Sequence, residues 1–316
     1  MKNKERNINL LTDFGFKRFF GTEKYKNNLI HFLNAFLPSY IGTVDDIKYL
    51  STEQLGQSEQ NKRLIFDVLC ASPKNDHIII EMQKASQEFI KNRIIAYSAR
   101  HISNSLDVGD RRYNFPTVLT IVLVDFEVPE LRDSDRFVQH VMLKDDNNDI
   151  FSDKMSFLLI DLTKFAVQKS FAQLTDERQK WCYVIKNICW MNDDDIPRNE
   201  IVFRELYKNC KLSKLTDMEK QEYEKSVLEY EDVKDAMEYH HRLGKEEGRE
   251  EGKEEGFNEG FDKGLKTGIG EGREKGRIEE KHLMVANMLK KGIPIPTIAE
   301  IAEMTEDEVR LCQAKE

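Results

Sequence analysis

The sequence predicts an α/β fold, and three observations support this prediction. Short apolar runs of strand length alternate with longer segments whose apolar residues recur at helical spacing. Over the first 126 residues these segments follow the order helix, three strands, helix, strand. The run TVLTIVLVDF at 117–126 is almost continuously apolar, which is typical of a strand covered by helices on both faces of a sheet. We therefore expect a mixed sheet flanked by helices, followed by a helical extension.

The individual elements follow from local pattern. The segment KYKNNLIHFLNAFLP has apolar residues one helical turn apart and ends at a proline, so it predicts a helix over 24–38. Three strands are expected next, in TVDDIKYL, RLIFDVLCA and HIIIEMQK, and the amphipathic segment SQEFIKNRIIAYSARHISNSLDVG predicts a long helix. After the apolar strand, two more strands are expected in RFVQHVMLKD and MSFLLIDL, and the spacing is helical from about 175 to 243.

Composition narrows the class of protein. Of the 316 residues, 33% are charged and 40% are hydrophobic, and no apolar run reaches the roughly 18 residues that a membrane span needs. The first residues lack the apolar stretch of a signal peptide, and the five cysteines show neither a CxxC pair nor neighbouring histidines. We expect a cytoplasmic protein with reduced thiols and no membrane partner.

Charge is distributed unevenly along the chain. Residues 1–124 contain 17 Lys and Arg against 13 Asp and Glu, while the remainder contains 31 against 44. The N-terminal part can therefore meet an anion, whereas the C-terminal part supplies the acidity of the whole chain.

Changes in pattern divide the chain into four parts. Residues 1–165 hold the predicted α/β core, and 166–243 form a helical appendage. In 244–280 glycine recurs at every fourth position, with Phe257, Phe261, Leu265 and Ile269 beside it. Each glycine costs a helix about 1 kcal/mol relative to alanine, so this part is either a disordered charged linker or a helix that associates with a second copy.

The fourth part, residues 281–316, predicts a small module of three helices. Pro296 opens one of these helices, and Thr305 with Glu308 forms a capping box that starts the next. The pattern is similar to a helix-turn-helix pair, but the acidic residues around 300–308 would repel DNA phosphates. A packing module is the favoured interpretation over a DNA reader.

Two acidic residues interrupt the central hairpin RLIFDVLCASPKNDHIIIEMQ. Alternation places Ile79, Glu81 and Gln83 on one face, and a tight turn at PKN sets Asp67 opposite Glu81 or one residue away. Two half-buried carboxylates repel each other and need a compensating cation. That cation is either a basic side chain, such as Arg93, or a hard divalent ion such as Mg²⁺.

The hairpin resembles the active-site hairpin of the PD-(D/E)XK nucleases, which have a restriction-endonuclease-like fold. More closely, the chain resembles the Rpn family of recombination-promoting nucleases, also described as putative transposases. The segments that carry this resemblance are TDFGFKRFFGTEKYKNNLIHFLNAFL, FDVLC, EMQ and the Tyr-to-Phe stretch 113–126, over about residues 8–165.

The resemblance implies a set of metal ligands. Asp67 and Glu81 would bind Mg²⁺, for which Mn²⁺ is a substitute, and the backbone carbonyl of Met82 would complete the shell. Asp13, in the family's opening Asp-x-x-Phe-Lys-x-x-Phe pattern and on the first helix that the resemblance implies, would be a third acid.

The resemblance also implies catalytic and DNA-binding residues. Gln83 occupies the position of the superfamily's lysine, and a neutral amide can position water or a phosphate oxygen but cannot accept a proton. Lys17 can reach the site from the first helix. Arg93, Arg111 and Arg112 would hold DNA phosphates.

The function expected from these residues is Mg²⁺-dependent DNA endonuclease activity, associated with recombination or mobile elements. The alternative is a nuclease-derived scaffold that binds DNA or a protein without catalysis, which Gln83 and the acidic C-terminal part favour. Partners would be DNA and, through 244–280, a second copy of the chain.

Overall fold

The computed structural model describes residues 7–37, 42–54, 64–83, 89–106, 111–126, 128, 135–165 and 169–313. The chain divides into two compact units, Met1–Tyr239 and His240–Glu316, and each is described by itself.

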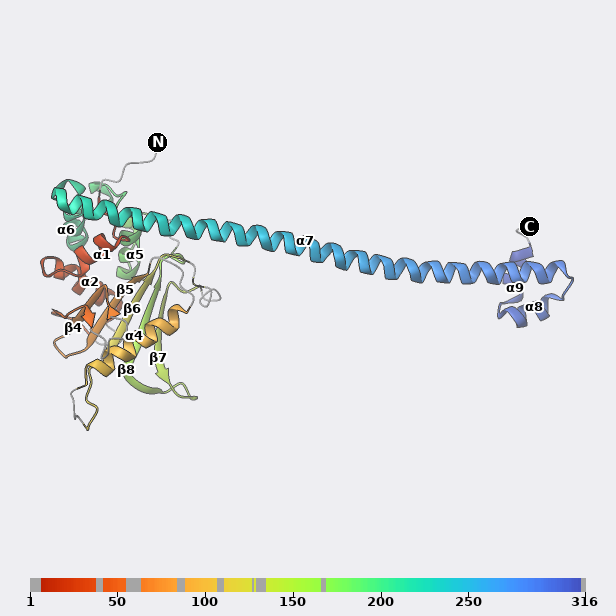
Figure 1. The fold of residues 1–316 in the computed structure, drawn as a ribbon, viewed down its shortest axis with the longest axis horizontal. Coiled ribbons are helices and arrows are strands. Elements are labelled where there is room, and N and C mark those ends of the chain that lie inside the picture. The colour runs from red at the N-terminus through yellow and green to blue at the C-terminus, as the bar shows by residue number, and fades with distance from the viewer. Residues whose placement is uncertain are drawn as a thin grey trace. The chain divides into compact units, whose positions relative to one another are not determined.

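A six-stranded mixed sheet forms the centre of the first unit (Figure 1). Its order is β1-β4-β5-β6-β8-β7, in which β5 pairs with β6 and β6 with β8 in parallel, while the other neighbours are antiparallel. The strands are β1 (Lys48–Tyr49), β4 (Val68–Ala71), β5 (His77–Gln83), β6 (Val118–Val124), β7 (Val138–Lys144) and β8 (Ile150–Asp161). A separate two-stranded sheet pairs β2 (Glu53–Gln54) with β3 (Leu64–Ile65).

Helices cover both faces of the six-stranded sheet. One face packs against α4 (Ile90–Asn104), whose Ile90 and Ile94 share a cluster with Val122 and Phe157. The other face buries alternate strand residues, among them Ile80 and Ile121, against helices on the opposite side. These helices are α1 (Asp13–Phe20), α2 (Lys26–Phe36), α5 (Glu177–Asn187) and α6 (Ile201–Asn209). The predicted α/β fold with a mixed sheet between helices is confirmed.

Two local predictions are wrong. The segment RLIFDVLCA is not one strand, because β3 ends at Ile65 and β4 begins at Val68, and the two strands belong to different sheets. Phe89 belongs to the segment that predicts the long helix, but it precedes α4 with a positive φ of 72° and its side chain is 58% exposed. Pro38, the expected end of the first helix, lies outside the described residues.

An aromatic cluster joins the later helices to the sheet. Trp181 of α5 is fully buried, and its ring lies 4.9 Å from that of Phe203 and 5.6 Å from that of Phe20, centroid to centroid. Its Nε1 donates a hydrogen bond to Nδ1 of His31 at 3.0 Å. The helices α5 and α6 therefore share the main core rather than forming a core of their own.

A histidine pair joins β5 to α4. Nδ1 of His77 lies 2.9 Å from Nε2 of His101, and His101 is buried beneath Phe66. The pKa of His101 is lowered to about 4, mainly by burial and to a smaller extent by the nearby His77. The pair is therefore neutral in the folded chain at pH 7.

The free energy of unfolding is expected to fall by up to about 3 kcal/mol as the pH drops from 6.5 to 4. In this window the unfolded chain protonates His101 while the folded chain does not, so acid favours unfolding. Urea denaturation across this range measures the effect. The His101→Gln variant should show a flatter profile, and an equally steep profile would assign the acid sensitivity to other groups.

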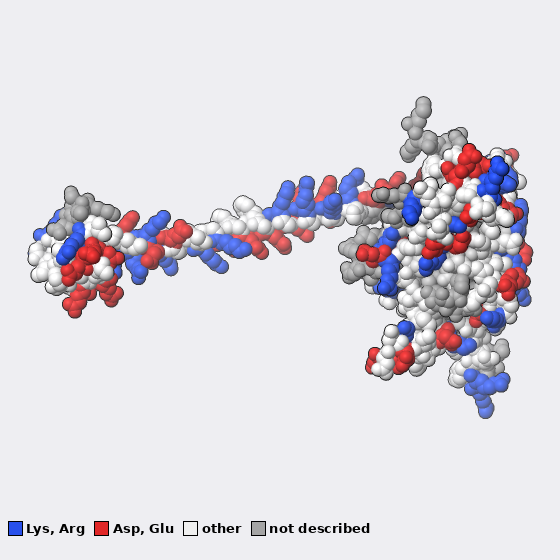
Figure 2. All heavy atoms as spheres, turned by 180° about the vertical axis from the view of Figure 1, so that it is seen from behind, with Lys and Arg blue, Asp and Glu red and all other residues white. Residues whose placement is uncertain are grey.

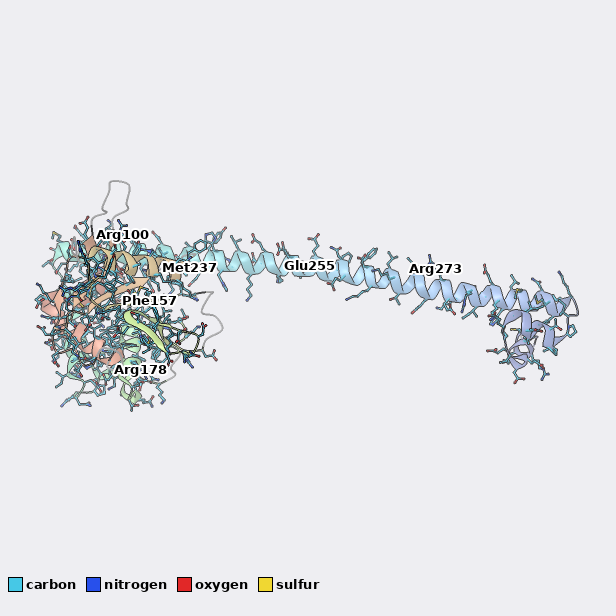
Figure 3. All side chains as sticks on the ribbon, turned by 90° about the horizontal axis from the view of Figure 1, so that it is seen from below. Arg100, Phe157, Arg178, Met237, Glu255 and Arg273 are labelled. Carbon is cyan, nitrogen blue, oxygen red and sulfur yellow. The ribbon has the colours of Figure 1, made fainter. Side chains whose placement is uncertain are left out.

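The long helix α7 (Asp217–Lys290) begins in the first unit and continues through the second. The glycine-repeat segment lies within this helix. Figure 2 shows acidic and basic side chains interspersed along this helix, and Figure 3 shows Glu255 and Arg273 projecting from it. Phe257, Phe261 and Leu265 are exposed beside the glycines.

Replacing Gly256, Gly260 and Gly264 with alanine is expected to stabilise this helix by about 1 kcal/mol per position. A methyl group at each of these glycines meets nothing within 4 Å. Thermal melting followed by circular dichroism measures the gain. Association of 244–280 with a second copy stays a prediction, and a lower mass of the variant in light scattering would place the glycines in such a contact.

The end of the second unit is a three-helix module. The last turns of α7 pack with α8 (Ile295–Ala302) and α9 (Glu306–Gln313) around Val285, Ile298 and Val309. The predicted capping box is confirmed, since the Thr305 amide donates to Glu308 Oε2 at 2.8 Å and the Glu308 amide donates to Thr305 Oγ1 at 3.3 Å. None of the described helices has both the length and the apolar character needed to cross a membrane.

Candidate functional site

The hairpin of β4 and β5 brings Asp67 next to Glu81. Its register pairs Val68 with Ile80 and Leu69 with Ile79. One step beyond the Val68–Ile80 pair, Asp67 on one side therefore lies opposite Glu81 on the other. The predicted pairing of these carboxylates is therefore what the strand register produces. Asp67 itself lies in the break between β3 and β4.

Each carboxylate contacts the backbone or side chain of the opposite strand. The backbone N–H of Asp67 donates to Oε1 of Glu81 at 3.4 Å, and the backbone N–H of Met82 donates to Oδ2 of Asp67 at 2.8 Å. Nε2 of Gln83 donates to Oε2 of Glu81 at 3.2 Å, on the same face of β5. These bonds hold both side chains in place without neutralising either charge.

Glu81 sits in an unfavourable environment for a carboxylate. Its side chain is only 5% exposed. The pKa of Glu81 is raised to about 8, first by burial and then by the negative charge of Asp67. The Asp67 amide, Arg93 and Lys17 lower this pKa and so only partly oppose the rise. A charged Glu81 therefore costs the fold free energy, which a cation placed between the two carboxylates would recover.

Lys17 of α1 lies beside Asp67, the first acid of this pair. Its Nζ lies 3.0 Å from Oδ1 of Asp13 and 3.7 Å from Oδ1 of Asp67. Although burial lowers the pKa of Lys17, its hydrogen bond to Asp13 and the charges of Asp13, Asp67 and Glu81 together raise it above the usual value. Lys17 thus compensates Asp67, while the charge of Arg93 lowers the pKa of Glu81 more than that of Lys17 does.

Local sequence explains how α1 presents Lys17. Thr12 caps the helix by accepting a hydrogen bond from the Gly15 amide at 3.1 Å. A Cβ at Gly15 would lie 2.1 Å from the backbone oxygen of Asn9, so only glycine permits this close approach. Asp13 and Lys17 are four residues apart and therefore lie on one side of the helix.

The first turns of α7 form part of the same site. A cleft of about 660 Å³ is lined by α1 residues including Asp13 and Lys17, by Asp67, and by α7. The α7 residues in this lining are Glu222, Lys225, Ser226 and Glu229. Sequence reasoning missed them because they lie more than 150 residues from Asp67, and only their spacing on one side of a helix signals a common role.

Hydrogen bonds fix α7 against α1. The Phe14 amide donates to Oγ of Ser226 at 3.0 Å, and the Asn9 amide donates to the Tyr223 hydroxyl at 3.0 Å. Arg18 also forms an ion pair with Glu219. The cleft thus has α1 and α7 as two fixed walls.

The three predicted DNA-binding arginines are placed differently. Arg93 is half-buried on α4, with its guanidinium 4.9 Å from the centre of the Tyr97 ring, and its charge lowers the pKa of Glu81. Arg111 and Arg112 are exposed and precede β6. Because β6 runs parallel to β5, their segment enters the sheet at the end far from Glu81.

The described residues contain no group of three or more His, Cys, Asp or Glu side chains arranged around one metal position. Asp67 and Glu81 therefore form a two-carboxylate donor set. Mg²⁺ is commonly held by one or two carboxylates while it keeps several waters, so this set fits a hard divalent ion. Asp13 and the Met82 carbonyl as further ligands stay predictions.

Comparison with known proteins identifies one family. Residues 10–240 match the family described as PD-(D/E)XK nuclease family transposase, which covers the whole sheet, the site and the start of α7. No match was found among curated proteins or among solved structures.

Proposed function

Because the chain belongs to the PD-(D/E)XK nuclease family transposases, we propose that it is a Mg²⁺-dependent endonuclease that hydrolyses DNA phosphodiester bonds. The observation that carries the proposal is the buried Glu81 beside Asp67, a pair that is unfavourable without a cation. Acidic groups with strongly perturbed pKa values cluster at functional sites. A role in recombination or in mobile elements, as in Rpn-type nucleases, is part of the same proposal.

Asp67 and Glu81 would hold the ion. When bound, Mg²⁺ (or Mn²⁺) lowers the pKa of a water and offsets negative charge on a phosphate. The backbone N–H of Met82 fixes the rotamer of Asp67, and the side-chain amide of Gln83 fixes the rotamer of Glu81. Both carboxylates are therefore oriented before substrate arrives.

Gln83 and Lys17 supply different contacts to the substrate. The Gln83 amide has a carbonyl oxygen and donor hydrogens, and with these it orients a water or a phosphate oxygen. Lys17 is a charged donor beside Asp67, and it would attract the scissile phosphate. Neither residue serves as the base, so a water near the phosphate is the proton acceptor in this proposal.

Chelation by EDTA is expected to stop the nicking of supercoiled plasmid, and added Mg²⁺ or Mn²⁺ should restore it. The Asp67→Asn variant should nick at least about 1,000-fold more slowly than the wild-type chain in Mg²⁺. The purified Asp67→Asn/Glu81→Gln double variant is the control for contaminating nuclease. Nicking retained by that double variant would remove this site from the reaction.

A non-catalytic scaffold is the second candidate, and Gln83 favours it because a neutral amide stands where the superfamily has lysine. In that case the chain would bind DNA equally with and without EDTA and would cleave none. The plasmid assay combined with a binding assay separates the two functions.

A further inference from the structure

The α7 wall of the cleft carries two carboxylates that do not take part in packing. With about 100° between successive residues, Glu222 and Glu229 lie on nearly the same line of the helix. Tyr223, Ser226 and Tyr230 lie about 40–120° further round, and these three are buried residues that fix α7 to the first unit. Glu222 and Glu229 are exposed and line the cleft.

The charges of the lining oppose a polyanion of high charge density more than one of low charge density. Each basic residue of the lining has an acidic neighbour. Lys17 lies beside Asp13 and Asp67. Arg18 pairs with Glu219, and Lys225 pairs with Glu229. Glu222 has no ion pair among the interactions of the described residues. A phosphate chain that enters the cleft therefore meets carboxylates on α7 opposite the Lys17 side, and the repulsion rises with its charge density.

The same cleft offers apolar surface. Ile65 is 59% exposed and lines the cleft together with the half-buried Phe14. Exposed apolar and aromatic side chains contact the faces of unstacked bases, which a single strand presents and a duplex hides.

We propose that Glu222 and Glu229 make this cleft selective for a single nucleic-acid strand. They oppose duplex DNA, which carries one charge per roughly 1.7 Å of its length, about twice the density of one strand. Lys225 and Lys17 hold the phosphates of the strand, and Ile65 contacts its bases. This proposal rests on the proposed nuclease function and names the substrate form of that site.

The test measures binding by fluorescence anisotropy, in EDTA at low salt, of a labelled 20-nucleotide single strand and of the same sequence as duplex. For the Glu222→Gln/Glu229→Gln variant we expect duplex affinity to rise about 5- to 10-fold and single-strand affinity only about 2-fold. The wild-type preference for the single strand should therefore shrink severalfold.

The chain offers a matched control. Glu224 and Glu231 are also seven residues apart on α7 and exposed, but they lie about 180–200° away from Glu222 and outside the cleft lining. The Glu224→Gln/Glu231→Gln variant changes the net charge by the same amount and should leave the strand preference unchanged. Equal effects in both variants would reduce the result to net charge and overturn the proposal.

The remaining outcomes are also decisive. An unchanged preference in Glu222→Gln/Glu229→Gln, or no binding by any of these chains, overturns the selectivity. The nuclease function is judged separately by plasmid nicking, because nicking that depends on Asp67 would stand even if the strand preference did not change.

Discussion

Replacing Glu81 with glutamine is expected to lower DNA cleavage at least about 1,000-fold and to stabilise the metal-free fold at the same time. The amide has nearly the same shape, but it removes a charge that is buried beside Asp67. The expected gain in the free energy of unfolding is roughly 2–3 kcal/mol at pH 8 in EDTA, measured by urea denaturation.

The gain should depend on pH in a defined direction. The pKa of Glu81 is raised to about 8 in the folded chain, against an ordinary value near 4.5. Between these values the folded chain binds the extra proton, so wild-type stability decreases as the pH rises through this window. The advantage of Glu81→Gln should thus be full near pH 8 and vanish near pH 4.5.

The control for this prediction is Glu205→Gln, an exposed glutamate on α6, which should change stability by less than about 0.5 kcal/mol. A Glu81→Gln variant that is less stable than wild type at pH 8 in EDTA would show that the carboxylate supports the fold. Glu81 would then be a structural residue, and its link to metal binding would be lost.

Replacing Trp181 with alanine is expected to destabilise the first unit by about 3–5 kcal/mol. Trp181 is fully buried among rings from α1, α2 and α6, and the substitution also leaves His31 without its hydrogen-bond donor. Urea or thermal denaturation measures the loss.

Trp190 provides the matched control, because it is 51% exposed and lies on the same stretch of chain. Trp190→Ala should cost less than about 1 kcal/mol. If Trp181→Ala left the β-sheet transition unchanged and melted only the later helices, residues after 166 would be an independent domain.

The fold and the acid pair could be predicted because their signals are local. Strand periodicity and turn position fix the register of β4 and β5, and the register alone sets Glu81 beside Asp67. The face of β5 that carries Glu81 and Gln83 follows from simple alternation. Helical spacing likewise marks α2 and α5 by residues that the structure buries.

Other parts of the site depend on tertiary contacts that no local pattern encodes. The break at Phe66–Asp67 looks like continuous strand in sequence, and it arises because β3 pairs with β2 instead of joining the main sheet. The α7 wall is set by the hydrogen bonds of Tyr223 and Ser226 to residues more than 200 positions earlier. The Lys17 contact with Asp67 depends on how α1 packs on the sheet.

The most direct test of metal binding by Asp67 and Glu81 is anomalous diffraction from crystals of the chain soaked in Mn²⁺. We expect an anomalous peak in contact with both the Asp67 and Glu81 carboxylates, and we expect the Lys17 ammonium to have moved away from Asp67. If no peak is found at this position and the ammonium is still held between Asp13 and Asp67, the two carboxylates do not form a metal site.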